Sequence, residues 1–115
     1  MKKILLIDNS DFFANELIAF LSEHSIYCLR CKDYQSAINE QRTSSVSSLI
    51  IEFFSNSIIF EFLNNTRYVN PYATIIVCAD YFSKEDLIAL KKLGIKNIFI
   101  KPFCLQEILK IVRGE

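Results

Sequence analysis

The sequence predicts an α/β domain in which one parallel sheet is covered by helices on both faces. Five short runs rich in aliphatic or β-branched residues recur along the chain, and segments with helical spacing of apolar residues follow each of them. This alternation indicates a parallel sheet, because parallel neighbours need crossover connections and right-handed crossovers place helices against the sheet. At 115 residues, the chain is the size of one domain, so we expect residues 1–115 to form a single domain.

The predicted strands are short and mostly apolar. The run from Ile4 to Ile7 has no polar side chain, which is typical of a strand buried on both faces. The polar stretch from Thr43 to Ser48 is interpreted as a loop. The five strands are expected at Lys3–Asp8, Ile26–Cys31, Leu49–Phe53, Ala73–Cys78 and Asn97–Ile100.

The first three helices are predicted from apolar spacing and from one capping residue. Apolar side chains recur at helical spacing over Asp11–Glu23, and His24 is expected where this helix ends. Asp33 is a suitable N-cap for a shorter second helix, because its carboxylate can accept a hydrogen bond from an amide of the first turn. The third helix is expected over Ile58–Thr66.

The last two helices have clearer signals. Ser83 and Asp86 resemble a capping box with aspartate in place of glutamate, and Gly94 can supply a left-handed stop. A helix over Lys84–Leu93 is therefore predicted. The spacing of four apolar residues predicts the final helix: Leu105, Ile108, Leu109 and Val112.

Composition argues against several classes of function. The 13 basic residues balance the 13 acidic ones, so no overall field attracts nucleic acid or an anionic membrane. No apolar stretch approaches the roughly 20 residues of a membrane span, and no signal peptide precedes the first strand, so we expect a cytoplasmic protein. A nucleotide-binding protein is a weak alternative, because neither of the two glycines forms a phosphate-cradling loop after a strand.

Cys28 and Cys31 have the CxxC spacing of metal and redox sites. Both are expected on a strand, where residues three apart point to opposite faces of the sheet. The two thiols then cannot share an ion without local distortion, and no second pair completes a zinc site. A structural role is therefore favoured for this pair.

Polar side chains gather where the predicted strands end. Asp8 and Asn9 end the first strand, Glu52 follows the run Leu49-Ile50-Ile51, Cys78 ends the fourth strand, and Lys101 follows the fifth. In open parallel sheets, sites form outside the carboxyl ends of the strands. A charge at the end of a buried run is costly unless it is solvated or paired, so Glu52 marks a candidate site.

This pattern resembles the receiver domain of bacterial two-component response regulators, the fold of the chemotaxis regulator. The resemblance covers the whole chain and rests on Ile4–Asn9, Leu49–Glu52, Gly94 and Ile100–Phe103. It implies a three-layer doubly wound (βα)5 sandwich with the flavodoxin-like strand order 2-1-3-4-5. It also implies a cis peptide bond before Pro102, and a role in phosphorelay signal transduction rather than an enzymatic one.

The resemblance further implies a role for each residue at the strand ends. In the family, an aspartate at the third strand end accepts a phosphoryl group, acids at the first strand end hold Mg²⁺, and a lysine contacts the phosphate. A hydroxyl on the fourth strand captures a phosphate oxygen, and an aromatic residue on the fifth swings inward. The residues of this chain at those positions are Glu52, Asp8 with Asn9, Lys101, Cys78 and Ile98.

Asp8 and Lys101 alone match the family pattern. Glu52 has the right group on a stem one methylene too long, and small displacements of reacting atoms are costly. Asn9 offers an amide oxygen without charge, so a magnesium site formed by Asp8, Asn9 and Glu52 is expected to be weak or absent.

The remaining departures affect the expected switch. The Cys78 thiol is a poor hydrogen-bond donor, and Ile98 has no ring. The segment 55–57 also lacks the usual proline and glycine, so the loop is expected to take a different path.

These departures predict a pseudo-receiver, a protein-interaction module in which Glu52 pairs with Lys101 and is not phosphorylated. The alternative is an active response regulator with Mg²⁺-dependent phosphoryl transfer from a histidine kinase. Under either interpretation, the expected partners are signalling proteins, either a histidine kinase or a downstream effector. Neither nucleic acid nor membrane is an expected partner of this domain.

Aromatic residues are the other feature of the expected loops. Two pairs, Phe53-Phe54 and Tyr81-Phe82, follow the third and fourth strands, and Phe12 lies near the first. These rings either roof the site and exclude water or present an apolar surface to a partner. A homodimer is one way to cover such a surface.

Overall fold

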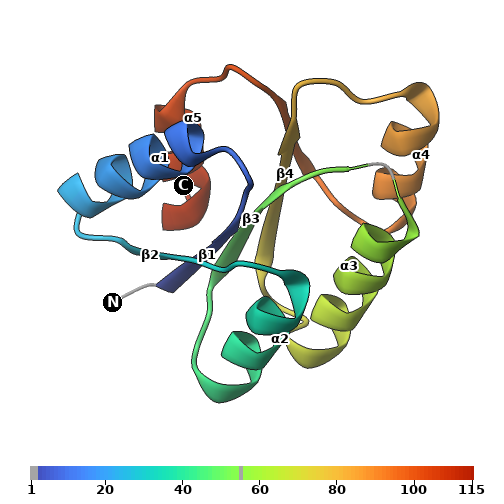
Figure 1. Cartoon of the computed structure of the whole chain (residues 1–115), viewed down its shortest axis with the longest axis horizontal. Helices are drawn as coiled ribbons and strands as arrows, with labels where there is room; N and C mark the ends of the chain where they lie inside the picture. Colours follow the sequence, from blue (N-terminus) through green and yellow to red (C-terminus); the bar gives the residue numbers. More distant parts are fainter. Residues whose placement is uncertain (1–2, 55) are drawn as a thin grey trace.

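A five-stranded parallel sheet forms the middle layer of the molecule (Figure 1). The computed structural model describes residues 3–54 and 56–115. The spatial order of the strands is β2-β1-β3-β4-β5, and every neighbouring pair is parallel. The predicted fold class and the strand order 2-1-3-4-5 are therefore confirmed. The strands are β1 (Lys3–Ile7), β2 (Tyr27–Arg30), β3 (Ser48–Glu52), β4 (Thr74–Ala79) and β5 (Asn97–Ile100).

Helices cover both faces of the sheet, and each face has its own apolar core. Helices α1 and α5 pack on one face, and α2, α3 and α4 pack on the other (Figure 1). Side chains of β1 alternate between the two cores, so that Ile4 and Leu6 face α1 and α5 while Leu5 faces the other layer. The helices are α1 (Asp11–Glu23), α2 (Tyr34–Thr43), α3 (Ser57–Val69), α4 (Lys84–Lys92) and α5 (Leu105–Arg113).

Capping residues mark the helix ends at the places that the sequence indicated. The Asp33 side chain accepts a hydrogen bond from the amide of Ser36, and the capping box between Ser83 and Asp86 is complete. His24 is the C-cap of α1, and Gly94 has a φ of 79°, which glycine adopts without the strain that a Cβ would add.

Several boundaries differ from prediction by one to three residues. The strand β1 ends at Ile7 rather than Asp8, because the Asp8 side chain turns the chain by accepting a hydrogen bond from the amide of Ser10. Helix α3 begins at Ser57 and continues to Val69, past the predicted end at Thr66. Its start is set by Asn56, whose side chain accepts a hydrogen bond from the amide of Ile59.

The cysteine pair lies on opposite faces of the sheet as predicted, although Cys31 follows β2 and is not part of the strand. Cys28 lies in the core under α1 and α5, whereas Cys31 lies in the core on the opposite face of the sheet. Both thiols are free and buried. Within the described ranges, none of the helices is long and apolar enough to cross a membrane.

Replacing Ser83 by alanine is expected to lower the free energy of unfolding by about 1 kcal/mol, because the amide of Asp86 then loses its capping acceptor. Urea denaturation followed by circular dichroism measures this change. Ser83→Asp retains an acceptor and is the matched control, expected to stay close to the native stability. Equal destabilisation by both substitutions would contradict the capping role.

Candidate functional site

The side chains of Asp8, Glu52 and Lys101 meet at the carboxyl edge of the sheet. Asp8 follows β1, Glu52 is the last residue of β3, and Lys101 follows β5. The Lys101 ammonium donates to Asp8 Oδ2 at 2.8 Å and to Glu52 Oε2 at 3.4 Å. The lysine therefore bridges the two carboxylates, and the predicted contact between Glu52 and Lys101 is present. The peptide bond between Lys101 and Pro102 is cis, as the resemblance implied.

The bridge is largely shielded from water. The Asp8 side chain is fully buried, and 12% of the Lys101 side chain and 17% of the Glu52 side chain are exposed. Burial by itself would lower the pKa of Lys101, but the hydrogen bond to Asp8 and the nearby negative charges outweigh it and raise the pKa. Lys101 is therefore held in its charged form at neutral pH.

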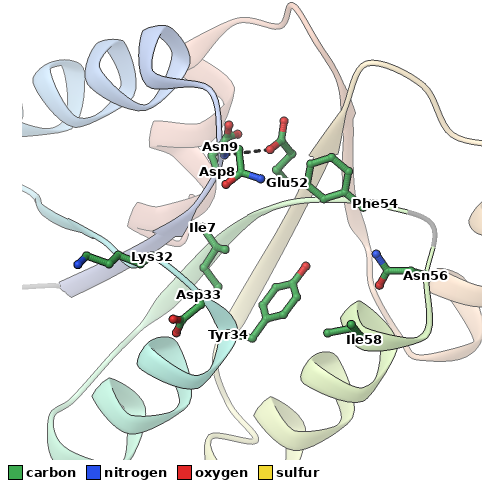
Figure 2. Close-up of a pocket in the computed structure, with 10 residues that line it drawn as sticks. All are labelled: Ile7, Asp8, Asn9, Lys32, Asp33, Tyr34, Glu52, Phe54, Asn56 and Ile58. Carbon is green, nitrogen blue, oxygen red and sulfur yellow. Dashed lines mark hydrogen bonds between the residues drawn. The ribbon is translucent and has the colours of Figure 1, made fainter.

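Backbone amides engage the two remaining carboxylate oxygens. The amide of Ser10 donates to Asp8 Oδ1 at 2.8 Å, and the amide of Asn9 donates to Glu52 Oε1 at 3.0 Å. Figure 2 shows this second bond as a dashed line between the end of β1 and Glu52. All four carboxylate oxygens of the site thus accept a hydrogen bond from the protein itself.

This hydrogen bonding bears on whether the site suits Mg²⁺. A hard divalent cation needs several oxygen ligands, and negative charge strengthens its binding. Here the Lys101 ammonium offsets one of the two carboxylate charges, and Asn9 adds no charge. Among the residues that the structure describes, no cluster of three or more His, Cys, Asp or Glu side chains is placed to hold a metal ion. The residues present therefore fit a divalent cation poorly.

Arg30 is a component of the site that the sequence did not reveal. From β2, its guanidinium donates to the backbone carbonyl of Asp8 through Nε at 3.1 Å and Nη2 at 2.6 Å, and it pairs with Asp11 at 2.8 Å. This fork fixes the turn that carries Asp8. The available signal was an arginine in an otherwise apolar strand, which does not identify a backbone carbonyl as its partner.

Phe13, on α1, is a second contact of the site that the sequence did not indicate. The Lys101 ammonium lies 4.2 Å from the centre of the Phe13 ring, within the range of a cation–π contact. The edge of Phe13 meets Phe103, whose ring centre is 5.2 Å from that of Phe99. The lysine is therefore held between two carboxylates and an aromatic cluster that extends from α1 to β5.

Cys78 and Ile98 pack in the two apolar cores, and Cys78 lies opposite Glu52 in the sheet register. The Cys78 thiol is completely buried and lies 3.7 Å from the carbonyl oxygen of Ile51. Burial raises its pKa to about 12, so the thiol stays protonated at neutral pH. Ile98 packs at the margin of the core between the sheet and the α2, α3 and α4 layer.

The aromatic residues of the loops divide into two groups. Phe53 and Phe82 are buried, and their ring centres lie 5.4 Å apart. Phe12, Phe54 and Tyr81 are exposed. One group therefore packs in the core, and the other faces solvent. Ser55, in the loop with the atypical sequence, lies outside the described residues.

A pocket of about 250 Å³ adjoins the charged side chains (Figure 2). It lies between the end of β1, the turn before α2 and the turn before α3. Its lining combines aromatic and aliphatic walls with acidic and amide groups: Ile7, Asp8, Asn9, Lys32, Asp33, Tyr34, Glu52, Phe54, Asn56 and Ile58.

Solved structures with this fold were found across the whole length of the chain. A response regulator from Thermotoga maritima has a TM-score of 0.86 at 19% identity and covers 99% of this chain and 96% of its own. A CheY-like receiver domain protein from Methanospirillum hungatei JF-1 has a TM-score of 0.87 at 14% identity, covering 99% and 92%.

A third structure has a known chemical state. A response regulator from Burkholderia pseudomallei, solved with a phosphorylated aspartic acid, a calcium ion and citrate, has a TM-score of 0.81 at 20% identity and covers 97% of this chain and 66% of its own. No protein-family model matches the sequence, and the comparison with curated proteins gives no match either. The chain thus has the fold of response-regulator receiver domains.

Replacing Lys101 by methionine is expected to lower the free energy of unfolding by about 3 kcal/mol at pH 7, because the fully buried Asp8 carboxylate loses its counter-charge. Urea denaturation measures this loss. The double variant Asp8→Asn with Lys101→Met removes both charges and is expected to recover part of it. A loss below about 1 kcal/mol in the single variant would show that the bridge contributes little.

The same variant tests the pH dependence of stability. The folded pKa of Lys101 lies above its unfolded value near 10.5, so the folded protein binds this proton more tightly. The stabilisation is fully present below the unfolded pKa and is lost as the pH rises through the folded pKa. The stability difference between the native protein and Lys101→Met should therefore shrink above pH 10.5. A difference that stays constant there would contradict this assignment.

Thiol labelling tests the burial of the cysteines. Cys104 is exposed, whereas Cys28, Cys31 and Cys78 are buried, and burial raises the pKa of each of these three thiols. Iodoacetamide at neutral pH should label only Cys104 in the folded chain and all four thiols in urea, since the thiolate is the nucleophile. Cys104→Ser should leave the folded chain unlabelled. Rapid labelling of Cys78 would show that its side chain opens to solvent.

Proposed function

We propose that the chain is a receiver-type domain of two-component phosphorelay signalling that works as a protein-interaction module and does not accept phosphate. It would be a pseudo-receiver formed by a single domain, with Glu52 at the phosphoacceptor position. The observation that supports this is the Lys101 ammonium bridging Asp8 and Glu52, with all four carboxylate oxygens already hydrogen bonded. In this proposal, the permanent ion pair between Glu52 and Lys101 replaces the negative charge that reversible phosphorylation would add.

Phosphoryl acceptance would require three things of this site. A carboxylate oxygen must be free to attack phosphorus in line, a cation must offset the incoming charge, and a donor must receive a phosphate oxygen. Both Glu52 oxygens are engaged, and the donor set fits a divalent cation poorly. The buried Cys78 thiol is a weak donor that already lies against a backbone carbonyl.

The convergence of Asp8, Glu52 and Lys101 also supports an alternative. The structurally similar Burkholderia pseudomallei regulator holds a phosphorylated aspartic acid and a calcium ion. By analogy, this chain would be an active regulator that takes a phosphoryl group on Glu52 from a histidine kinase. Mg²⁺ bound at Asp8, Asn9 and Glu52 would then have to compete with Lys101 for the carboxylates.

The proposal includes partners and location. A module of this kind acts through another signalling protein, either a histidine kinase or a downstream effector, and in the cytoplasm. The balanced overall charge gives no reason to include nucleic acid or a membrane surface among its partners.

Incubation with acetyl phosphate and Mg²⁺ tests the proposal directly. We expect no mass increase of one phosphoryl group in the intact chain, and no change of backbone amide shifts with beryllium fluoride. Stoichiometric acyl phosphate at Glu52 would overturn the pseudo-receiver and support the active regulator.

Glu52→Asp separates the effect of the stem length from the effect of the rest of the site. We expect this variant to remain inert, because Cys78 and Asn9 are unchanged and Lys101 still offsets one charge. The double variant Glu52→Asp with Cys78→Thr also places a hydroxyl at position 78, where the family has one. Phosphorylation of Glu52→Asp alone would show that one methylene is the whole difference.

A further inference from the structure

The pocket beside Glu52 has walls suited to a flat group. The Tyr34 ring stacks on Phe62 with ring centres 4.7 Å apart and planes 25° from parallel, so its orientation is fixed from behind. Figure 2 shows the Tyr34 hydroxyl pointing up toward the part of the pocket where Glu52 and Phe54 lie. None of the hydrogen bonds between described residues uses this hydroxyl. Two aromatic residues, Tyr34 and Phe54, thus border one small cavity.

The pocket is also negatively charged. Its lining carries three carboxylates, and Lys101 and Lys32 supply two positive charges, so one negative charge is left over. In Figure 2, the Lys32 side chain extends away from the other lining residues. The inner part of the pocket is therefore more negative than the net charge of the whole lining. Glu52 lines the pocket, and 17% of its side chain is exposed. A cation is the complementary ligand.

One first-turn amide of each adjoining helix already donates to a cap. The amides of Ser36 and Ile59 donate to Asp33 and Asn56, at 2.8 and 3.1 Å. A phosphate or carboxylate in the pocket would also have to approach Glu52 closely. The acidic lining therefore disfavours an anionic ligand.

The rim of the pocket is apolar and exposed. Phe54, which follows β3, is 46% exposed, and Ile58, in the first turn of α3, is 60% exposed. Exposed large apolar side chains around a small central pocket are typical of a surface that binds another protein through one anchoring side chain. At about 250 Å³ the pocket is also smaller than most ligand sites, but it can hold one long side chain.

We propose that this pocket receives an arginine side chain of a partner protein. The planar guanidinium would stack against Tyr34 and Phe54 and pair with the negative charge of Glu52, which also lines the pocket. Arginine fits better than lysine because its guanidinium is flat, stacks on rings and donates in a fork to a carboxylate. This inference rests on the proposed function, since it assigns the partner contact of a protein-interaction module.

Nuclear magnetic resonance titration of the ¹⁵N-labelled chain tests the assignment. The probe is acetyl-Gly-Arg-Gly-amide, compared with the same peptide containing lysine or the uncharged isostere citrulline. We expect saturable shifts at Asn9, Tyr34, Glu52 and Phe54, with a dissociation constant on the order of 1 mM for one anchoring side chain. The citrulline peptide should bind at least about tenfold more weakly, and the lysine peptide should fall between them.

Two variants locate the binding, and a third is the matched control. Glu52→Gln removes the charge with little change of shape, and Phe54→Ala removes one stacking face at an exposed position. Each variant should lower the affinity for the arginine peptide at least about threefold. Tyr81→Ala removes an aromatic ring that is more exposed than Phe54 and does not line the pocket, and this variant should bind as the native chain does.

Several results would overturn this assignment. Equal binding of the citrulline and arginine peptides would show that charge does not contribute to binding. Unchanged binding in both Glu52→Gln and Phe54→Ala would show that the peptide binds elsewhere. Agmatine binding at least about tenfold more tightly than the peptide would assign the pocket to a small guanidine compound instead. The titration needs neither Mg²⁺ nor a phosphoryl donor. Phosphorylation at Glu52 would therefore overturn the proposed function and leave arginine binding as a separate result.

Discussion

The ammonium group of Lys101 is the contact on which the carboxyl edge of the sheet depends. Asp8 is fully buried there, and a buried carboxylate is costly unless a counter-charge and hydrogen bonds satisfy it. Lys101, which follows the edge strand β5, supplies that charge and also reaches Glu52. One side chain therefore links β1, β3 and β5. Two further residues support the contact between Lys101 and Asp8. Arg30 binds the backbone carbonyl of Asp8, and the Phe13 ring contacts the Lys101 ammonium.

This arrangement gives two neighbouring regions different properties. In the charged region, every carboxylate oxygen already has a protein donor, which favours one fixed state over a cycle of phosphate binding and release. The adjoining pocket is lined by aromatic and acidic groups, and its rim is open to solvent. Glu52 borders both regions. Its carboxylate meets the Asn9 amide and Lys101, and the residue also lines the pocket.

The residues that complete the site were hidden from sequence reasoning for a physical reason. Arg30 acts on the backbone carbonyl of Asp8, and every residue has such a carbonyl, so no side-chain pattern indicates the pair. Phe13 has the spacing of an ordinary core residue of α1, and its contact with Lys101 needs the two ends of the chain to meet. Tyr34 likewise has the position of an ordinary residue in the first turn of α2. Its stacking on Phe62 depends on how α2 and α3 pack against one another.

The sequence by itself determined the order of elements, the parallel sheet, the helix caps at Asp33 and Ser83, and which charged residues follow each strand. These features follow from local patterns, because spacing, capping and turn residues act within a few positions of the chain. The tertiary structure decided which of these groups touch. Distances between Lys101, Asp8 and Glu52, the separation of buried Phe53 from exposed Phe54, and the shape of the pocket all arise from packing between distant segments.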